Sequence, residues 1–432
     1  MIFAVARAAL LLALLIPSLA AAQTDSVTRT KLPNGLTVLV RENPIAPVVA
    51  FSVMVKMGTR TETPATAGIS NLLQLMMVRG TDKLAGEQIV EAADRMGGSI
   101  DAYGDADYSE ITATALSRSW QEMLELVADI ALRPSLPDGT FGPVRDFLAR
   151  QIRNRGDKPS DVAMDRMREA LYGSHPYAWD PTGRRGSLER LTRDALVAYY
   201  RAHYVPDGMV VAVSGQVKTA EVQAQVARLF GGMPAGKAPT PSPPAPPPMA
   251  ATRQVFTVPG AQAQIVMSGL APSLTDKDYA PTKVLASLLG GGMAGRYFSE
   301  LRDKQALAYT TFAQYATRVD TSAFVNLLGT APENVAKAEA ALKTELARVQ
   351  NEPVSAQELS IAKAYLLGSQ AMDRRTNQRQ AWYLAFYEVA GVGPEFLDRY
   401  AADVKQVTAA DLQRVARRYL GTVRTVIVEP PK

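Results

Sequence analysis

Apolar and polar residues follow the same order of patterns twice along the chain. Longer stretches with apolar residues three and four positions apart predict helices in both halves. Near the end of each half, Thr192 or Thr408 precedes such a stretch and an acidic residue follows in the first turn, which is typical of a helix N-cap. Runs of β-branched and apolar residues predict strands at 36–41, 48–56 and 209–213, and again at 253–258, 264–268 and 424–428. The pattern therefore predicts two diverged copies of one unit.

A proline-rich segment separates the two copies. Residues 234–248 read PAGKAPTPSPPAPPP, and proline at this density removes backbone donors and fixes φ. We expect a semi-rigid spacer over 234–250, between an N-terminal domain at 23–233 and a C-terminal domain at 251–432. Strands mixed with long helices predict an α+β fold, in which each domain has a mostly antiparallel sheet with helices packed on one face.

The first 22 residues have the pattern of a secretory signal. Arg7 is the only early charge, an apolar run follows from Ala8 to Leu19, and three alanines offer small residues for cleavage. This run is shorter than the roughly 18 residues of a membrane-spanning helix, although a retained anchor is the alternative. No later segment is apolar enough to span a bilayer. We expect a periplasmic protein without a stable membrane span.

Composition removes several classes of chemistry. The chain has no cysteine and only two histidines, His175 and His203, so thiolate metal sites are absent and histidine-based catalysis has few candidates. His175 precedes Pro176 and is expected to be a turn residue, and His203 is expected to be a capping or surface residue. The net charge of +5 is dispersed among acidic residues, without the basic and aromatic runs of nucleic-acid binders.

One predicted helix carries a family resemblance. Residues 67–81, AGISNLLQLMMVRGT, resemble the zinc-binding helix of the pitrilysin/insulinase peptidases, an inverzincin family that includes the subunits of mitochondrial processing peptidase. The family motif is His-x-x-Glu-His within a frame of Gly, Met and Gly-Thr. That frame is intact here, but the three chemical positions hold Asn71, Gln74 and Leu75.

These three residues cannot do the chemistry of the motif. Positions i, i+3 and i+4 share one helical face, so two imidazoles and a carboxylate there would converge on one zinc ion. An amide oxygen is a weak ligand, glutamine has no basic group, and leucine has no lone pair. The resemblance places the third family ligand, a glutamate, at Gln151 or alternatively Arg150, and neither side chain replaces it. We expect no metal or other cofactor in this chain.

Two further segments extend the likeness. Residues 97–111 are similar to the family's edge-strand segment, in which an Asn-Ala pair lines the substrate cleft, but Asp101 replaces the Asn here. Residues 288–315 resemble the C-terminal motif in which an Arg and a Tyr seven residues later reach the active site of the zinc-bearing half. Those positions are Arg302 and Tyr309.

The second motif is also compatible with purely structural roles. Arg302 could be a solvated helix residue beside acidic neighbours, and Tyr309 could pack in a half-buried strand. Three glycines at 290–292 could cradle a phosphate, but no Gly-Lys-Ser/Thr follows, and a cleft lip or a turn fits better.

The resemblance implies a division of labour. Some bacterial members of the family pair a zinc-bearing chain with a similar chain that supplies the Arg and Tyr, and each chain forms a clam-like half of a chamber. We hypothesise that this chain is the non-catalytic subunit, inactive alone, with zinc in its homologous partner and unfolded peptide as substrate. The alternatives are a non-enzymatic peptide-binding or assembly protein that keeps the fold, and an autonomous enzyme with different chemistry.

Overall fold

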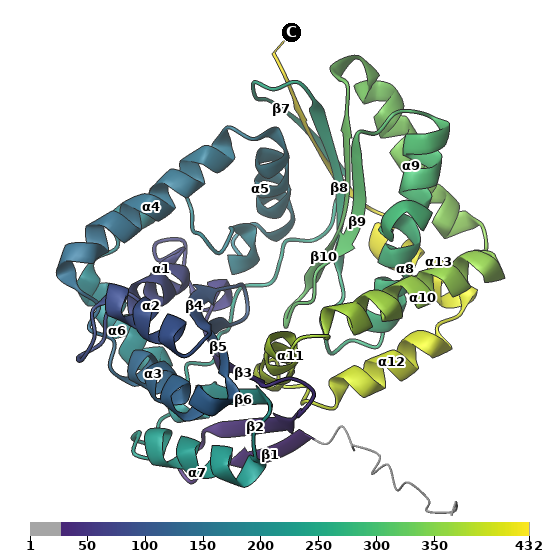
Figure 1. Cartoon of the computed structure of the whole chain (residues 1–432). Coiled ribbons are helices and arrows are strands. Elements are labelled where there is room, and N and C mark those ends of the chain that lie inside the picture. Colours follow the sequence, from purple (N-terminus) through teal and green to yellow (C-terminus); the bar gives the residue numbers. More distant parts are fainter. Residues whose placement is uncertain (1–26, 432) are drawn as a thin grey trace, which may run out of the picture.

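The computed structural model describes residues 27–431, which form two α+β units, each built on one sheet (Figure 1). The predicted signal segment, residues 1–22, lies outside the described residues. Residues 234–250 between the two units belong to no helix or strand. Among the described residues, no helix combines the length and apolar character needed to cross a membrane.

The N-terminal unit has a six-stranded sheet in the order β1-β2-β6-β3-β5-β4, with only the β2–β6 pair parallel. Its strands are β1 (Val27–Lys31), β2 (Thr37–Glu42), β3 (Val48–Val55), β4 (Ser99–Gly104), β5 (Ser109–Leu116) and β6 (Met209–Gly215). Its helices are α1 (Ile69–Met77), α2 (Gly86–Arg95), α3 (Trp120–Leu132), α4 (Asp138–Gly156), α5 (Pro159–Tyr172), α6 (Arg193–His203) and α7 (Thr219–Phe230).

The C-terminal unit has a five-stranded sheet in the order β7-β11-β8-β10-β9, with only the β7–β11 pair parallel. Its strands are β7 (Thr252–Thr257), β8 (Ala263–Ala271), β9 (Thr310–Tyr315), β10 (Ser322–Thr330) and β11 (Arg424–Glu429). Its helices are α8 (Tyr279–Gly290), α9 (Val335–Asn351), α10 (Ala356–Asp373), α11 (Asn377–Val389), α12 (Phe396–Gln406) and α13 (Ala409–Leu420).

Each sheet has its second face covered by a helix from the other unit. Helices α1, α3 and α7 pack on one face of the N-terminal sheet, and α11 packs on the opposite face against β3 and β6. In return, α5 packs on the C-terminal sheet against β8 and β11, opposite α8, α9 and α13 (Figure 1). The two units are therefore interleaved rather than simply joined by the spacer.

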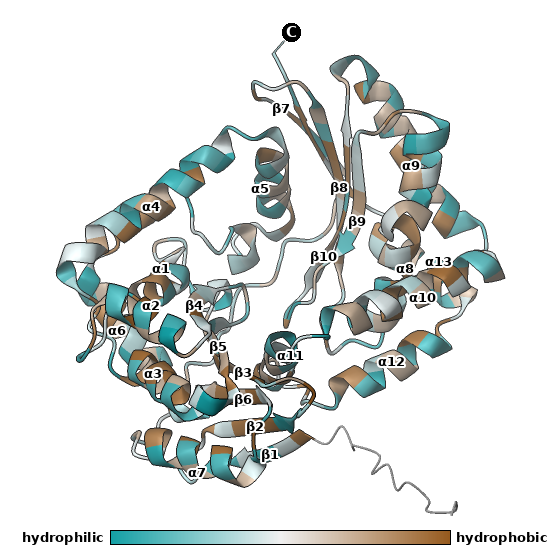
Figure 2. Cartoon of the chain, viewed as in Figure 1, coloured by the Kyte–Doolittle hydropathy of each residue, from teal (hydrophilic) through white to brown (hydrophobic). Residues whose placement is uncertain are grey.

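The side chains of β3 show why both faces are buried. Val49, Phe51 and Val53 belong to the core beneath the unit's own helices, whereas Ala50 and Met54 belong to the core that contains α11. Successive side chains of a strand point to opposite faces, so a strand buried on both sides is apolar at most positions. The one polar residue of β3, Ser52, is buried and donates a hydrogen bond to Glu110. Figure 2 shows this concentration of hydrophobic residues in the inner strands, while α4 is largely hydrophilic.

The predicted α+β fold with two similar units is confirmed. Both predicted N-caps are present, because the Thr192 hydroxyl accepts a hydrogen bond from Ala195 N and the Thr408 hydroxyl accepts one from Asp411 N. Apart from α5 and α11, the helices that pack on a sheet belong to the same unit and lie on one face of it, as predicted. The exchange of α5 and α11 between the units was not predicted.

Lys283 on α8 provides a test of the packing in the C-terminal unit. Its Nζ donates to Tyr315 O at 2.8 Å and lies 5.3 and 4.9 Å from the ring centroids of Tyr279 and Tyr315. Burial, and then repulsion by Arg318, lower the pKa of Lys283 to about 7. Between this value and the ordinary lysine pKa near 10.5, the unfolded chain keeps a proton that the folded protein has released.

We therefore expect Lys283 to make the free energy of unfolding rise by about 1 kcal/mol per pH unit above pH 7. Lys283→Met should remove this slope. Urea unfolding of both proteins at pH 7, 8 and 9 measures it, and parallel pH profiles would contradict the assignment.

Candidate functional site

Helix α1 begins at a buried carboxylate. Glu62, 4 % exposed, accepts hydrogen bonds from Gly68 N at 2.9 Å, from Ser70 N at 3.0 Å and from Trp179 Nε1 at 3.0 Å. A carboxylate at this position satisfies free amide groups of the first helical turn and matches the positive end of the helix dipole. Burial nevertheless raises the pKa of Glu62. The framework that would present a metal motif is therefore firmly held.

The three motif positions on α1 are engaged in packing and hydrogen bonds. Asn71 Oδ1 accepts from Gly104 N at 3.2 Å, which ties α1 to the end of the edge strand β4. Gln74 is fully buried and donates through Nε2 to Tyr204 Oη at 2.8 Å, while its Oε1 has no hydrogen-bond partner within residues 27–431. Leu75 packs against the N-terminal core. Each residue has a structural role in place of a ligand role.

The third expected position lies on α4, which contacts α1. Gln151 is half-buried and Arg150 is exposed on this helix. The three ligand positions thus hold the amide of Asn71, the alkyl side chain of Leu75 and the amide of Gln151. They do not form a zinc site, because none of them supplies an imidazole nitrogen or a carboxylate. Among the described residues, no group of three His, Asp or Glu side chains is placed to hold a metal ion. The residues present do not fit the family's zinc.

Replacing Gln74 by Leu should lower the free energy of unfolding by about 1–3 kcal/mol, since it leaves the buried Tyr204 hydroxyl without its partner. Tyr204→Phe should cost a similar amount for the complementary reason. The double variant should lose clearly less than the two single losses combined, because no polar group is then left unpaired. Strict additivity in urea unfolding would show that the two side chains are not coupled.

Arg302 of the second motif lies on a π-helical segment, Tyr297–Lys304, whose buried residues hold it against the C-terminal core. Tyr297 is fully buried and donates to Asn326 Oδ1 at 2.7 Å, and Leu301 is fully buried as well. The preceding Arg296, 6 % exposed, donates to Glu358 Oε1 at 2.8 Å. This hydrogen bond lowers the pKa of Glu358 to about 2. π-Helical turns are rare and concentrate at functional sites.

Arg302 lies on the exposed side of this segment, and Tyr309 lies beyond its end, directly before β9. Arg302 Nη1 donates to Tyr309 O at 3.3 Å, and its guanidinium lies 4.9 Å from the Phe298 ring centroid. The connection between them passes through Ala306, whose φ of 52° is in the left-handed region that non-glycine residues rarely adopt. Tyr309 is 58 % exposed, so strand packing does not explain it. The Arg302 side chain thus contacts the backbone of Tyr309, and both side chains are exposed.

The predicted cleft strand is an edge strand. β4 pairs only with β5, and β9, which begins directly after Tyr309, pairs only with β10. Asp101 on β4 is exposed, and its Oδ1 accepts from Ala102 N at 2.8 Å. Edge strands keep backbone donors and acceptors that can pair with an extended peptide.

Both histidines are structural. His175 is 2 % exposed, accepts from Tyr177 N through Nδ1 at 3.0 Å, and burial lowers its pKa. This agrees with the predicted turn role. His203 is 5 % exposed, with Nδ1 2.9 Å from Tyr199 O at the end of α6. This contact with a carbonyl of the last helical turn agrees with the expected capping role of His203, whereas the alternative surface position is wrong, because the ring packs against the Tyr199 ring at 4.0 Å between centroids.

A polar cluster joins the two units and was not identified from the sequence. Asp107, 8 % exposed, accepts from Tyr177 Oη and from Val319 N, the latter at 3.2 Å. Arg318 donates to Asp105 Oδ1 at 3.0 Å, and its guanidinium lies 5.6 Å from the Tyr177 ring centroid. Burial raises the pKa of Asp107. The cluster connects the β4–β5 turn to the β9–β10 turn and fixes the relative position of the units.

Two family profiles match the chain. Residues 37–180 match the profile described as Insulinase (Peptidase family M16), and residues 190–366 match the one described as Peptidase M16 inactive domain. The first range includes α1 with the degenerate motif, and the second includes Arg302 and Tyr309. Together the two matches cover most of the chain.

Matches to individual relatives cover most of this chain and most of each relative. An uncharacterized zinc protease of Streptomyces coelicolor is 27 % identical over 92 % of this chain and 88 % of its own. One from Bacillus subtilis is 26 % identical over 79 % and 83 %, respectively.

Solved structures show the same fold. A protease from Helicobacter pylori superposes with a TM-score of 0.87 at 24 % identity, over 94 % of this chain and all of that one. A peptidase M16 inactive domain from Pseudomonas fluorescens gives 0.87 at 20 % identity, over 94 % and 99 %.

Proposed function

Because the chain belongs to peptidase family M16 and its own ligand positions do not fit zinc, we propose that it is the non-catalytic subunit of a heterodimeric zinc endopeptidase. Its partner would be a homologous chain with an intact His-x-x-Glu-His motif, and the pair would act in the periplasm on unfolded peptides. The observation that carries this proposal is the asymmetry between the two motifs. The ligand positions are built into packing, while Arg302 and Tyr309 are exposed on an anchored segment.

The chemistry of the two exposed groups supports this division. The zinc-bearing partner would supply the activated water. The Arg302 guanidinium would donate to a backbone carbonyl of the substrate, and the Tyr309 hydroxyl would supply a second hydrogen-bond donor. Donors placed at the scissile carbonyl stabilise the negative charge that develops on its oxygen. Because the ligand positions of this chain do not fit zinc, both groups would act beside the zinc of the partner subunit.

The edge strands support binding of an extended peptide. A peptide added beside an edge strand would pair with its free backbone groups in a sequence-tolerant way. β9 begins directly after Tyr309, so a peptide on this strand would pass the Arg302–Tyr309 pair. This arrangement fits a substrate that is unfolded rather than globular.

Mixing the chain with its His-x-x-Glu-His homologue tests the proposal. We expect the two proteins to co-elute as a complex, and hydrolysis of an unstructured fluorogenic peptide to need both. Zinc in the complex should be found at one ion per pair. A stable homodimer without affinity for the homologue, together with no hydrolysis in any mixture, would instead support a non-enzymatic peptide-binding or assembly role.

A further inference from the structure

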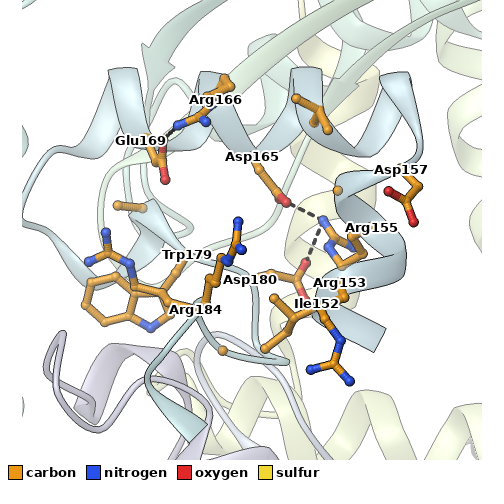
Figure 3. A pocket seen from close by; sticks show the side chains of 15 residues that line it. Ile152, Arg153, Arg155, Asp157, Asp165, Arg166, Glu169, Trp179, Asp180 and Arg184 are labelled. Atoms are coloured by element: carbon orange, nitrogen blue, oxygen red, sulfur yellow. Dashed lines mark hydrogen bonds and ion pairs between the residues drawn. The ribbon is translucent and has the colours of Figure 1, made fainter. Parts of the chain in front are cut away.

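A cavity of about 650 Å³ opens between the end of α4, α5 and the loop after Trp179 (Figure 3). One of its lining residues, Ile152, directly follows the expected ligand position Gln151 in the sequence. The loop is held tightly against the start of α1, because a Cβ on Gly183, whose φ is 108°, would come within 2.9 Å of Ala67 O. The cavity has the size of a ligand site, and neither the proposed reaction nor the family comparisons assign it a role.

Two aspartates that line the cavity, Asp165 and Asp180, are already paired with arginines. Arg155 Nη2 lies 2.7 Å from Asp165 Oδ1 and 3.4 Å from Asp180 Oδ2, as the dashed lines in Figure 3 show. Arg168 makes a second ion pair with each of these aspartates. Burial by itself would raise the pKa of Asp180, but Arg168 and Arg155 hold that pKa below its ordinary value. These aspartates are therefore not free to attract a cation.

Three other arginines of the lining have no carboxylate partner among the described residues. Arg153 lies on the last turns of α4, and Arg184 and Arg185 lie on the loop opposite. The same three residues also line an adjoining cavity of about 220 Å³, so they surround the boundary between the two spaces. The Arg184 guanidinium lies 5.6 Å from the ring centroid of the buried Trp179, which orients it. Asp157, exposed at the rim, is the only lining acid that lacks an ion pair within the described chain.

We propose that this cavity binds an acidic segment of the peptide substrate through Arg153, Arg184 and Arg185. Guanidinium groups bind carboxylates with two parallel hydrogen bonds, and the apolar lining from Ile152, Val162 and Trp179 suits the stems of glutamate and aspartate. A volume of this size and its apolar walls exceed what a small inorganic anion needs. The identity of the ligand as a peptide rests on the proposed function.

Peptide binding to the isolated chain tests this inference without relying on catalysis. Fluorescence anisotropy would compare a labelled unstructured peptide containing a Glu-Glu-Asp segment with the same peptide carrying Gln-Gln-Asn. At low salt we expect the acidic peptide to bind at least about fivefold more tightly, and the difference to shrink as salt screens the charges. Arg184→Gln with Arg185→Gln should remove the preference. Arg118→Gln with Arg201→Gln, which removes two arginines elsewhere on the surface, should keep it.

Equal affinity for the two peptides, or a preference that survives in the Arg184/Arg185 variant, would overturn the inference. Inorganic phosphate serves as the competing anion. If it displaced the acidic peptide more effectively than chloride at matched ionic strength, the cavity would be a small-anion site and not a peptide site. The hydrolysis assay of the mixed subunits is independent. A failure there with an intact acidic preference would remove the heterodimeric function and leave the binding site.

Discussion

Replacing Arg302 by Ala should lower kcat/KM of the assembled peptidase about 100- to 1000-fold while the two subunits still co-elute. The Arg302 guanidinium is exposed and makes one hydrogen bond within the described chain, to Tyr309 O. The main effect of the substitution is therefore the removal of a hydrogen-bond donor to the reacting carbonyl. Removing one such donor from a water-excluded site costs about 3–4 kcal/mol of transition-state stabilisation. Tyr309→Phe, which deletes only the hydroxyl, should give a loss in the same range.

Two neighbouring substitutions are matched controls. Gln305→Ala changes an exposed residue directly after the same segment, and Tyr365→Phe removes a hydroxyl from a tyrosine that is 46 % exposed on α10. Both should leave kcat/KM within about twofold of the wild type. Combining Arg302→Ala with Tyr309→Phe should cost less than the product of the single losses if both act on one carbonyl. Unchanged turnover in both single variants would show that the two residues have no part in catalysis.

Replacing Asp107 by Ala should lower the free energy of unfolding by about 3–5 kcal/mol, because it removes the centre of the cluster between the two units. The substitution leaves the buried Tyr177 hydroxyl and the Val319 amide without their acceptor, and Arg318 with Asp105 as its remaining counter-charge. Buried donors and charges without partners are among the costliest changes in a protein. Urea unfolding, followed by tryptophan fluorescence, measures the loss.

Asp101→Ala is the control for the same chemical change. Asp101 lies on the edge strand β4, is exposed, and accepts a hydrogen bond from the adjacent amide of Ala102. Its replacement should change the free energy of unfolding by no more than about 0.5 kcal/mol. A loss under about 1 kcal/mol for Asp107→Ala would mean that the units are positioned by the exchanged helices alone.

The structural features that could be predicted from the sequence depend on residues that are close together in the chain. Strands β3, β6 and β11 follow β-branched apolar runs, and the caps at Thr192 and Thr408 depend on residues within one helical turn. The substituted ligand positions on α1 could also be identified in this way, because each substitution is a change of residue type within an intact motif frame. Arg302 and Tyr309 were identified from a motif in which the two residues are seven positions apart, and their role at an active site stays a prediction.

Contacts between distant residues were not predictable in this way. Asp105 and Arg318 are 213 positions apart, and no pattern in either segment identifies the other. The left-handed φ of Ala306 also has no sequence signal, since alanine ordinarily avoids that region. Likewise, an apolar run predicts that β3 is buried on both faces without saying that α11 covers one of them.

The exchange of α5 and α11 also sets an order in which the protein can be made. A nascent chain that has emerged through β6 holds every strand of the first sheet, but Leu39, Met54 and Val210 on one face must wait for residues 377–389. Until those residues arrive, the partly folded chain displays an apolar sheet surface, which is the kind of surface that chaperones hold. Completion of the first unit is thus a late event in biosynthesis, although its strands are synthesised early.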